Sequence, residues 1–218
     1  MENPIKITAV CGWAIAPEWF HERVTRFFPT AEIRAIYPHR PEDADEAREL
    51  LSTWPSHLYI GYSLGSLWLL HHQKNIPASA TKALLAPILA FTREQAHGGK
   101  TSITQLKYLI KLLYRNPGDT SALKDFYIRC NFSVPEAWMK AIPDQQALIR
   151  GLEFLMDVSA PESSAKDFVA IVGEDDNFLD PFMLKCKLPQ LDIVAGAGHE
   201  PEQLLGRLAQ QLRHKFNL

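Results

Sequence analysis

A serine lies between two glycines in residues 61–65, GYSLG, which fit the pattern G-x-S-x-G. This pattern is typical of a sharp turn from a strand into a helix, where the serine hydroxyl is exposed and can act as a nucleophile. A short Gly/Ser-rich turn also arises by chance, so the flanking residues matter. The apolar run HLYI precedes the turn, and the segment LGSLWLLHH, which has helical character, continues from it. We therefore predict that Ser63 is a nucleophile.

A serine hydroxyl attacks only if a neighbouring base takes its proton, and histidine is the usual base near neutral pH. The chain has eight histidines. His199 follows the run LDIVAG and a turn of small residues, 196–198, and it precedes a predicted helix at Pro201. His71 and His72 belong instead to the helix after the serine, and the other five lack such a context. His199 is the predicted base, and a solvated turn histidine is the alternative.

A carboxylate must hold the base in its reactive tautomer and stabilise the imidazolium that forms. The predicted strand at 168–172 ends in an acidic loop that runs from Gly173 to Pro181. Asp180, directly before Pro181, suits the cap of a following helix. The residue types alone leave the choice open among the four acids of this loop. They are Glu174, Asp175, Asp176 and Asp180.

The negative oxygen that forms during acyl transfer needs two backbone N–H donors. The serine turn supplies one of them, the amide of Leu64. The second is expected from the loop after the first strand, CGWA at residues 11–14. Gly12 would let the backbone approach the site, so we assign the second donor to the amide of Trp13. The indole of Trp13 can still pack in the core, because only its backbone is needed.

These residues must be brought together by the elements between them. Short apolar runs rich in β-branched residues alternate with longer segments of helical periodicity, which predicts a parallel sheet covered by helices. Strands are expected at 5–10, 32–37, 57–61, 82–86, 168–172 and 192–194, and helices at 18–28, 42–51, 64–74 and 201–215. The serine, acid, histidine and oxyanion segments each follow a predicted strand. They therefore meet at the carboxyl edge of the sheet.

The alternation stops between about residues 91 and 150, where no strand signal interrupts the chain. Helical spacing predicts helices at 103–114 and 121–130. We interpret residues 91–150 as a helical lid insertion within a single domain that spans residues 1–218. An apolar face on the first of these helices could line an acyl pocket. Its residues are Leu106, Leu109, Ile110, Leu112 and Leu113.

The charge of the chain is unevenly distributed. The formal net charge is -2, yet residues 93–150 hold nine Lys and Arg against five acids and so carry +4. Lys107, Lys111 and Arg115 recur every four residues, which places three cations on one face of a predicted helix. This face could dock an acidic protein such as acyl carrier protein. A solvated helix face is the alternative.

The composition is that of a globular protein, with 46% hydrophobic and 22% charged residues among 218. The near-neutral charge gives no footprint for nucleic acid. Three scattered cysteines, without a C-x-x-C pair, favour neither a disulfide framework nor structural zinc. No signal-peptide pattern and no long apolar run are visible. We expect a cytoplasmic, monomeric protein that needs no membrane, metal or organic cofactor.

Four segments, CGWA, GYSLGS, the acidic loop and GAGHEP, resemble the α/β-hydrolase superfamily in order and spacing over nearly the full chain. CGWA with its Trp-Phe helix, GYSLGS and GAGHEP look like the BioH-type and BioG-type pimeloyl-acyl-carrier-protein methyl ester esterases of biotin synthesis. The resemblance implies an α/β-hydrolase fold, with a mostly parallel sheet flanked by helices and a helical lid. It also implies Asp176 as the acid, three residues after the glycine that closes the strand, with Asp175 as the alternative.

The chain departs from this family at three places, and one of them is an extra residue between Asp176 and Pro181. Cys11 stands where the family usually has histidine before the oxyanion glycine, and Ser66 replaces a glycine after the serine turn. Residues 123–130 resemble the family's lid, in which a Phe-Tyr pair is followed by a cysteine. Phe126 and Arg129 in this segment are therefore candidates for contact with a substrate or partner, together with the three cations of the preceding helix.

The sequence thus predicts a serine carboxylesterase that works through an acyl-enzyme on Ser63. The resemblance implies pimeloyl-acyl-carrier-protein methyl ester as the substrate, although a small-molecule ester is also compatible. The alternatives on the same triad are a thioesterase, a lactonase and a general esterase. A further alternative is a non-catalytic protein that binds a small molecule in its pocket or a protein on its basic helix.

Overall fold

The computed structural model describes residues 4–116, 121–130 and 143–216. Six strands form one sheet in the order β2-β1-β3-β4-β7-β8, and all of its strand pairs are parallel. The strands are β1 (Lys6–Val10), β2 (Glu32–Ile36), β3 (Leu58–Tyr62), β4 (Thr81–Leu85), β7 (Val169–Gly173) and β8 (Asp192–Val194). Every residue of β3 is buried, as expected for a strand covered on both faces.

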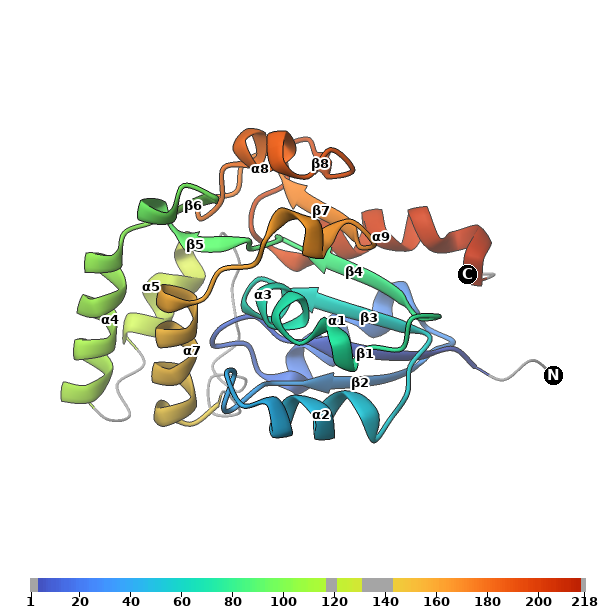
Figure 1. Ribbon diagram of the computed structural model, residues 1–218, viewed down its shortest axis with the longest axis horizontal. Coiled ribbons are helices and arrows are strands. Elements are labelled where there is room, and N and C mark those ends of the chain that lie inside the picture. Colours follow the sequence, from blue (N-terminus) through green and yellow to red (C-terminus); the bar gives the residue numbers. More distant parts are fainter. Residues whose placement is uncertain (1–3, 117–120, 131–142, 217–218) are drawn as a thin grey trace.

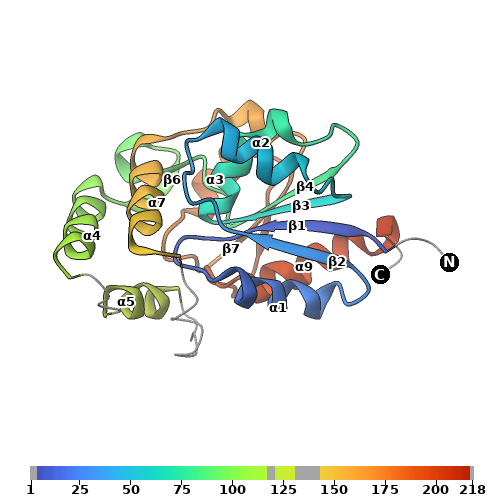
Figure 2. The same cartoon turned by 90° about the horizontal axis from the view of Figure 1, so that it is seen from below.

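Helices cover both faces of this sheet (Figure 2). Helices α1 and α9 lie on one face, and α2 and α3 lie on the other. Their bounds are α1 (Pro17–Phe27), α2 (Ala44–Ser52), α3 (Leu64–His71) and α9 (Pro201–Phe216). Helix α2 begins at a cap, because the Asp43 carboxylate accepts hydrogen bonds from the amides of Asp45 and Glu46. The predicted class, a parallel sheet flanked by helices, is confirmed.

Several short elements connect the larger ones. They are α8 (Pro181–Lys187) and the 3₁₀-helices η1 (Gln73–Asn75), η2 (Arg93–Gln95) and η3 (Glu162–Ala165). Asp180 caps α8 through the amides of Phe182 and Met183, as the sequence predicted. Within the described ranges, no helix is both long and apolar enough to cross a membrane.

The expectation that no strand interrupts residues 91–150 is wrong. Strands β5 (Ala90–Thr92) and β6 (Gly98–Thr101) pair in parallel as a separate two-stranded sheet. They escape detection because they have only three and four residues and β6 reads GGKT, without apolar alternation. Gly99 also forms an isolated antiparallel bridge to Leu179, so β6 lies against the loop that follows β7.

Three further helices gather beyond the carboxyl ends of the strands, on the opposite side of the molecule from both termini (Figure 1). They are α4 (Ile103–Arg115), α5 (Ser121–Arg129) and α7 (Gln145–Asp157). Helix α4 begins at a capping box between Ser102 and Gln105. Helix α7 continues past residue 150, so the predicted end of the lid insertion falls inside a helix. The division into core and lid stays a prediction.

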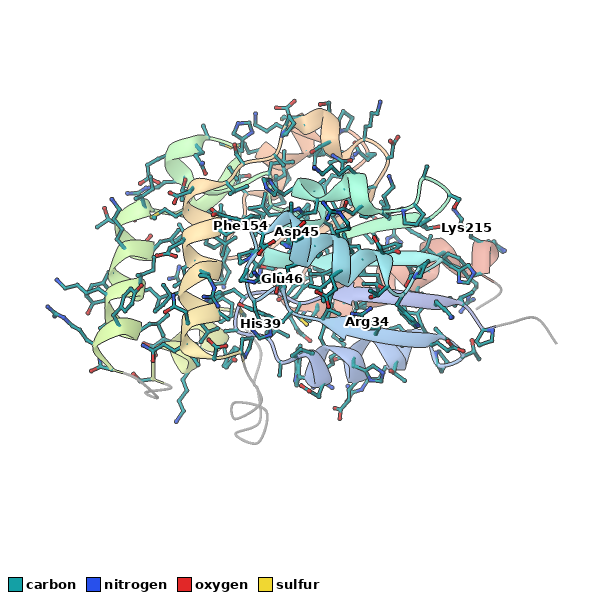
Figure 3. The ribbon with its side chains drawn as sticks, turned by 60° about the horizontal axis from the view of Figure 1, so that its bottom comes forward. Arg34, His39, Asp45, Glu46, Phe154 and Lys215 are labelled. Atoms are coloured by element: carbon teal, nitrogen blue, oxygen red, sulfur yellow. The ribbon has the colours of Figure 1, made fainter. Side chains whose placement is uncertain are left out.

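Helix α7 is fixed to the core by several contacts, two of which involve Phe154 and His39, both labelled in Figure 3. The fully buried ring of Phe154 packs edge-on against His71 of α3, with ring centroids 5.5 Å apart. Arg150 Nε donates to the carbonyl of His39, 2.7 Å away, in the turn after β2. The amide of His39 in turn donates to the carboxylate of Glu46 on α2. The helix is therefore held at a defined place above the strand ends.

Candidate active site

Ser63 stands between β3 and α3 in a strained backbone conformation, with φ 52° and ψ −116°. A positive φ is costly for a residue with a side chain, and it persists only where the surrounding structure imposes it. The Ser63 amide donates to the carbonyl of Leu85 on the neighbouring strand, at 2.9 Å. This turn leaves the hydroxyl at the carboxyl edge of the sheet, as the sequence predicted.

The two glycines of the turn are required by close backbone approach. A Cβ on Gly61 would lie 2.5 Å from the carbonyl oxygen of Gly65 and 2.8 Å from Cα of Ser66. A Cβ on Gly65 would collide with the backbone of Val10 and Cys11. The atoms that an added Cβ would meet belong to the backbone, so no side-chain rotation can relieve these contacts. The pattern G-x-S-x-G is thus a packing requirement as well as a motif.

We expect Gly65→Ala to destabilise the protein by about 2–4 kcal/mol, because β1 or α3 must shift to admit the new methyl group. Chemical denaturation of both proteins measures this difference. Gly198→Ala is the matched control, since its Cβ would meet only the carbonyl oxygen of Asp175, at 3.9 Å. Equal unfolding free energies for the two variants would contradict the packing argument.

His199 reaches Ser63 from the loop after β8. Its Nε2 lies 3.0 Å from Ser63 Oγ, and both side chains are buried. The hydroxyl of Tyr62 donates to the backbone carbonyl of His199 at 2.9 Å. The ring of Phe178 packs edge-on against the imidazole, with centroids 5.0 Å apart. The histidine is therefore held through both its backbone and its ring.

The structure places Asp176 behind this histidine. Asp176 Oδ2 lies 2.7 Å from His199 Nδ1. The other carboxylate oxygen, Oδ1, accepts hydrogen bonds from the amides of Phe178 and Leu179, at 2.8 and 3.0 Å. Asp176 is 1% exposed, so this paired carboxylate is shielded from water. The hydrogen bond at Nδ1 favours the tautomer in which Nε2 can accept the serine proton.

The other three acids of this loop have different surroundings. Asp175 is exposed, and its backbone amide donates to the carbonyl of Ala197. Glu174 accepts from the amide of Gly196 at 3.2 Å, and Asp180 caps α8. The choice that the residue types left open is therefore decided by position. Only Asp176, among these four, has its carboxylate against the histidine.

The two predicted oxyanion donors are the amide of Leu64, in the serine turn, and the amide of Trp13, in the loop after β1. The amide of Leu64 opens helix α3, and neither it nor the amide of Trp13 has a hydrogen-bond partner among the described residues. The loop that contains Trp13 is held by hydrogen bonds with helices α7 and α5. The Trp13 indole donates to the carbonyl of Leu148 at 2.8 Å, and the Tyr127 hydroxyl donates to the carbonyl of Ala14 at 2.5 Å. The role of the two amides as oxyanion donors stays a prediction.

A cavity of about 510 Å³ opens at the serine and the histidine. Its walls are mainly apolar and come from the core, α4, α5 and α7. They include Trp13, Phe91, Leu106, Leu109, Leu112, Phe126, Leu152, Leu155 and Phe178. Leu106, Leu109 and Leu112 were predicted to line such a pocket. The predicted contributions of Ile110 and Leu113 are not found, since neither residue belongs to the cavity lining.

The candidate binding residues of the helical segment divide into two groups. The ring of Phe126 packs edge-on against Trp13 at 4.9 Å, and Arg129 stacks its guanidinium over Phe178 at 5.1 Å; both residues line the cavity. The predicted cations of α4 are exposed and lie outside the cavity lining. They are Lys107, Lys111 and Arg115.

Two buried groups near the triad stay protonated. Burial raises the pKa of Tyr62 above its ordinary value, and the nearby Cys130 and Asp176 add to this effect. Tyr62 is therefore a hydrogen-bond donor over the working pH range. Burial likewise raises the pKa of the Cys130 thiol, so this cysteine is a poor nucleophile. Across the described residues, no group of three or more His, Cys, Asp or Glu side chains could hold a metal ion.

No protein-family model and no curated protein matches this chain. Solved structures match over almost its whole length. An esterase from Exiguobacterium antarcticum superposes with a TM-score of 0.73 at 13% identity, covering 100% of this chain and 94% of that one. An N-acyl homoserine lactonase in complex with N-hexanoyl homoserine lactone gives 0.70 at 13% identity, covering 99% and 92%. A bromoperoxidase from Bacillus anthracis gives 0.69 at 10% identity, with the same coverage.

At such low identity these matches show the fold, and the fold is that of the α/β-hydrolases. Its carboxyl edge carries the serine, histidine and aspartate that the sequence singled out. Several residues at the site escaped the sequence analysis, among them Phe178 and Lys100. Phe178 was visible two positions after Asp176, but an aromatic residue there gives no chemical signal. Lys100, described below, had no signal, since its strand was not predicted.

Proposed function

We propose that this protein is a serine ester hydrolase with an apolar acyl-binding cavity. One observation carries the proposal, namely the continuous chain of short contacts from Ser63 Oγ through His199 to the buried Asp176. A pocket that only binds a ligand needs no such chain. The strained backbone of Ser63 supports the same conclusion, because such strain is typical of functional positions.

The geometry supports a two-step reaction. His199 Nε2 takes the proton of Ser63 while Oγ attacks the ester carbonyl, and Asp176 stabilises the imidazolium that forms. The amides of Trp13 and Leu64 bind the negative oxygen of the tetrahedral intermediate. The imidazolium then protonates the departing alcohol, which leaves the acyl group on Ser63. Water, deprotonated by His199, hydrolyses this acyl-enzyme and restores the serine.

The substrate class is tested with a panel of p-nitrophenyl esters of increasing acyl length, an acyl-CoA, an N-acyl homoserine lactone and a free methyl ester. The mainly apolar cavity predicts a preference for acyl chains of several methylenes over acetate. Preference for the lactone or the acyl-CoA would instead favour a lactonase or a thioesterase. No hydrolysis of any member, with no labelling by a fluorophosphonate, would overturn the proposal in favour of a binding protein.

Within this class we propose the methyl ester of a pimeloyl group on acyl carrier protein as the substrate, with residues 91–150 acting as the lid. The exposed cations Lys107, Lys111 and Arg115 on α4 support this, because carrier protein is acidic and α4 also lines the cavity. None of the three makes an ion pair with another described residue. They are therefore available for an acidic partner.

Reversing these three charges to glutamate should lower kcat/KM for the carrier-bound ester about tenfold or more, mainly through association. Activity on free methyl pimelate ester should stay unchanged, since the three side chains lie outside the cavity. Steady-state kinetics on both substrates at low ionic strength measures the difference. Each single reversal of Lys107, Lys111 and Arg115 is also compared with the reversal of Arg48, an exposed cation on α2, as a control for one changed charge. Equal losses of kcat/KM in the two kinds of variant would contradict the proposal that these cations dock carrier protein.

A further inference from the structure

The loop that carries Asp176 is held along its length by strand β6. The amide of Lys100 donates to the carbonyl of Phe178 at 2.8 Å, and the amide of Asp180 donates to the carbonyl of Gly98 at 2.7 Å. Gly99 and Leu179 form an antiparallel bridge between these two bonds. The acid loop is thus paired to a strand outside the main sheet, over the residues directly after the aspartate.

A side chain completes this attachment at the aspartate itself. Lys100 Nζ donates to the backbone carbonyl of Asp176 at 2.6 Å. A hydrogen bond from an ammonium group is shorter and stronger than one between neutral groups. The ammonium group makes no ion pair with any other described residue. Among the described residues, the hydrogen bond of the ammonium group is the one to this carbonyl.

We propose that Lys100 is a positioning residue of the triad, which fixes the Asp176 backbone so that its carboxylate stays against His199. The proposal rests on the proposed hydrolase function. The backbone carbonyl and the carboxylate of Asp176 are restrained by different groups. Lys100 holds the carbonyl, whereas the amides of Phe178 and Leu179 hold Oδ1. With both restrained, Oδ2 lies 2.7 Å from His199 Nδ1.

The electrostatics favour the same arrangement. The Lys100 charge contacts the backbone carbonyl of the aspartate, whereas the histidine contacts its carboxylate. It stabilises the negative carboxylate while that carboxylate stabilises the imidazolium. The histidine loop has its own attachment, the hydrogen bond from the Tyr62 hydroxyl to the His199 carbonyl. Each of the two loops is therefore fixed by one side chain that donates to the carbonyl of its triad residue.

The test compares Lys100→Met with Lys100→Arg. We expect Lys100→Met to lower kcat on a short p-nitrophenyl ester about tenfold, since a small displacement of a catalytic group is costly. KM should change little, because Lys100 lies outside the cavity lining. Lys100→Arg keeps the charge and the donors, so it should recover most of kcat. Wild-type kcat in Lys100→Met, or equal losses in both variants, would overturn the proposal.

Lys185 provides a matched control. Its Nζ also donates to backbone carbonyls, those of Pro189 and Leu191, at 2.9 and 2.6 Å. Lys185→Met therefore removes the same kind of bond at a distance from the aspartate. We expect wild-type kcat in this variant. A loss equal to that of Lys100→Met would mean that lysine-to-carbonyl bonds act only through general stability, which would overturn the assigned role.

A spectroscopic measurement separates this proposal from the proposed function. The proton between His199 Nδ1 and Asp176 gives a far-downfield proton NMR signal when the bond is short and shielded from water. The signal needs no substrate, so it can be recorded even if no ester is hydrolysed. We expect it in the wild type and in Lys100→Arg, and expect it shifted upfield or broadened in Lys100→Met. An unchanged signal in Lys100→Met would overturn the proposal whatever the outcome of the activity assays.

Discussion

Ser63→Ala should reduce kcat/KM for every ester that the wild type hydrolyses by about 10⁴-fold or more, because the nucleophile is removed and no other group replaces it. The candidate substitutes are poor. Cys130 and Tyr62 are buried, with raised pKa values that keep them protonated. Ser66 donates to the carbonyl of Ser63 and belongs to helix α3. Initial rates for the purified variant, with active-site titration of the wild type, measure the loss.

The serine variant should remain folded, which makes it a clean test. Alanine has no hydroxyl but retains Cβ, so the contacts of the strained turn are kept. Its melting temperature should lie within a few degrees of that of the wild type. A fluorophosphonate should label the wild type and leave the variant unmodified. Retained hydrolysis or labelling in a folded Ser63→Ala protein would show that another residue is the nucleophile.

Asp176→Asn should lower kcat by about 10³- to 10⁴-fold with a small effect on KM. The amide of asparagine can donate its hydrogen bond to Nδ1, which favours the tautomer that cannot take the serine proton. It also carries no charge to stabilise the imidazolium. The amides of Phe178 and Leu179 can still donate to the remaining carbonyl oxygen, so the loop should keep its conformation.

Asp175→Asn is the matched control for this substitution. It removes the same charge from the neighbouring residue of the same loop, but the Asp175 side chain is exposed. We expect its kcat to stay within about twofold of the wild type, as for most surface substitutions. Steady-state kinetics on one ester compares the two. A larger loss in Asp175→Asn than in Asp176→Asn would assign the acid role to Asp175.

The main sheet and its helices could be predicted because each carries a long and regular pattern. β3 is a continuous apolar run, and the helix after it begins at the serine turn. The geometry of parallel strands then brings the ends of β1, β3, β7 and β8 to one edge. Ser63 followed from the G-x-S-x-G pattern between a strand and a helix, and His199 followed from its place in a loop at that edge.

Other features depend on contacts that no local pattern encodes. Four acids share one loop, and their residue types are equivalent until the fold turns Asp176 inward against the histidine. β6 consists of Gly, Gly, Lys and Thr, and it becomes a strand only because Ala90–Thr92 and the acid loop lie on either side of it. The role of Lys100 depends entirely on that pairing. The apolar stripe of α4 was visible, but which of its leucines face the cavity was not.

The loop of Trp13 has a consequence for how substrates are discriminated. One proposed oxyanion donor, the Leu64 amide, belongs to the core helix α3, whereas the loop of the other proposed donor is hydrogen-bonded to α7 at Leu148 and to α5 through Tyr127. These same two helices supply walls of the acyl cavity. If the proposed function holds, we expect an acyl chain too bulky for the cavity to press on the helices that support the Trp13 loop and to leave the Leu64 amide in place. A poorly fitting substrate would then lower kcat, and its binding affinity alone would not reveal the difference.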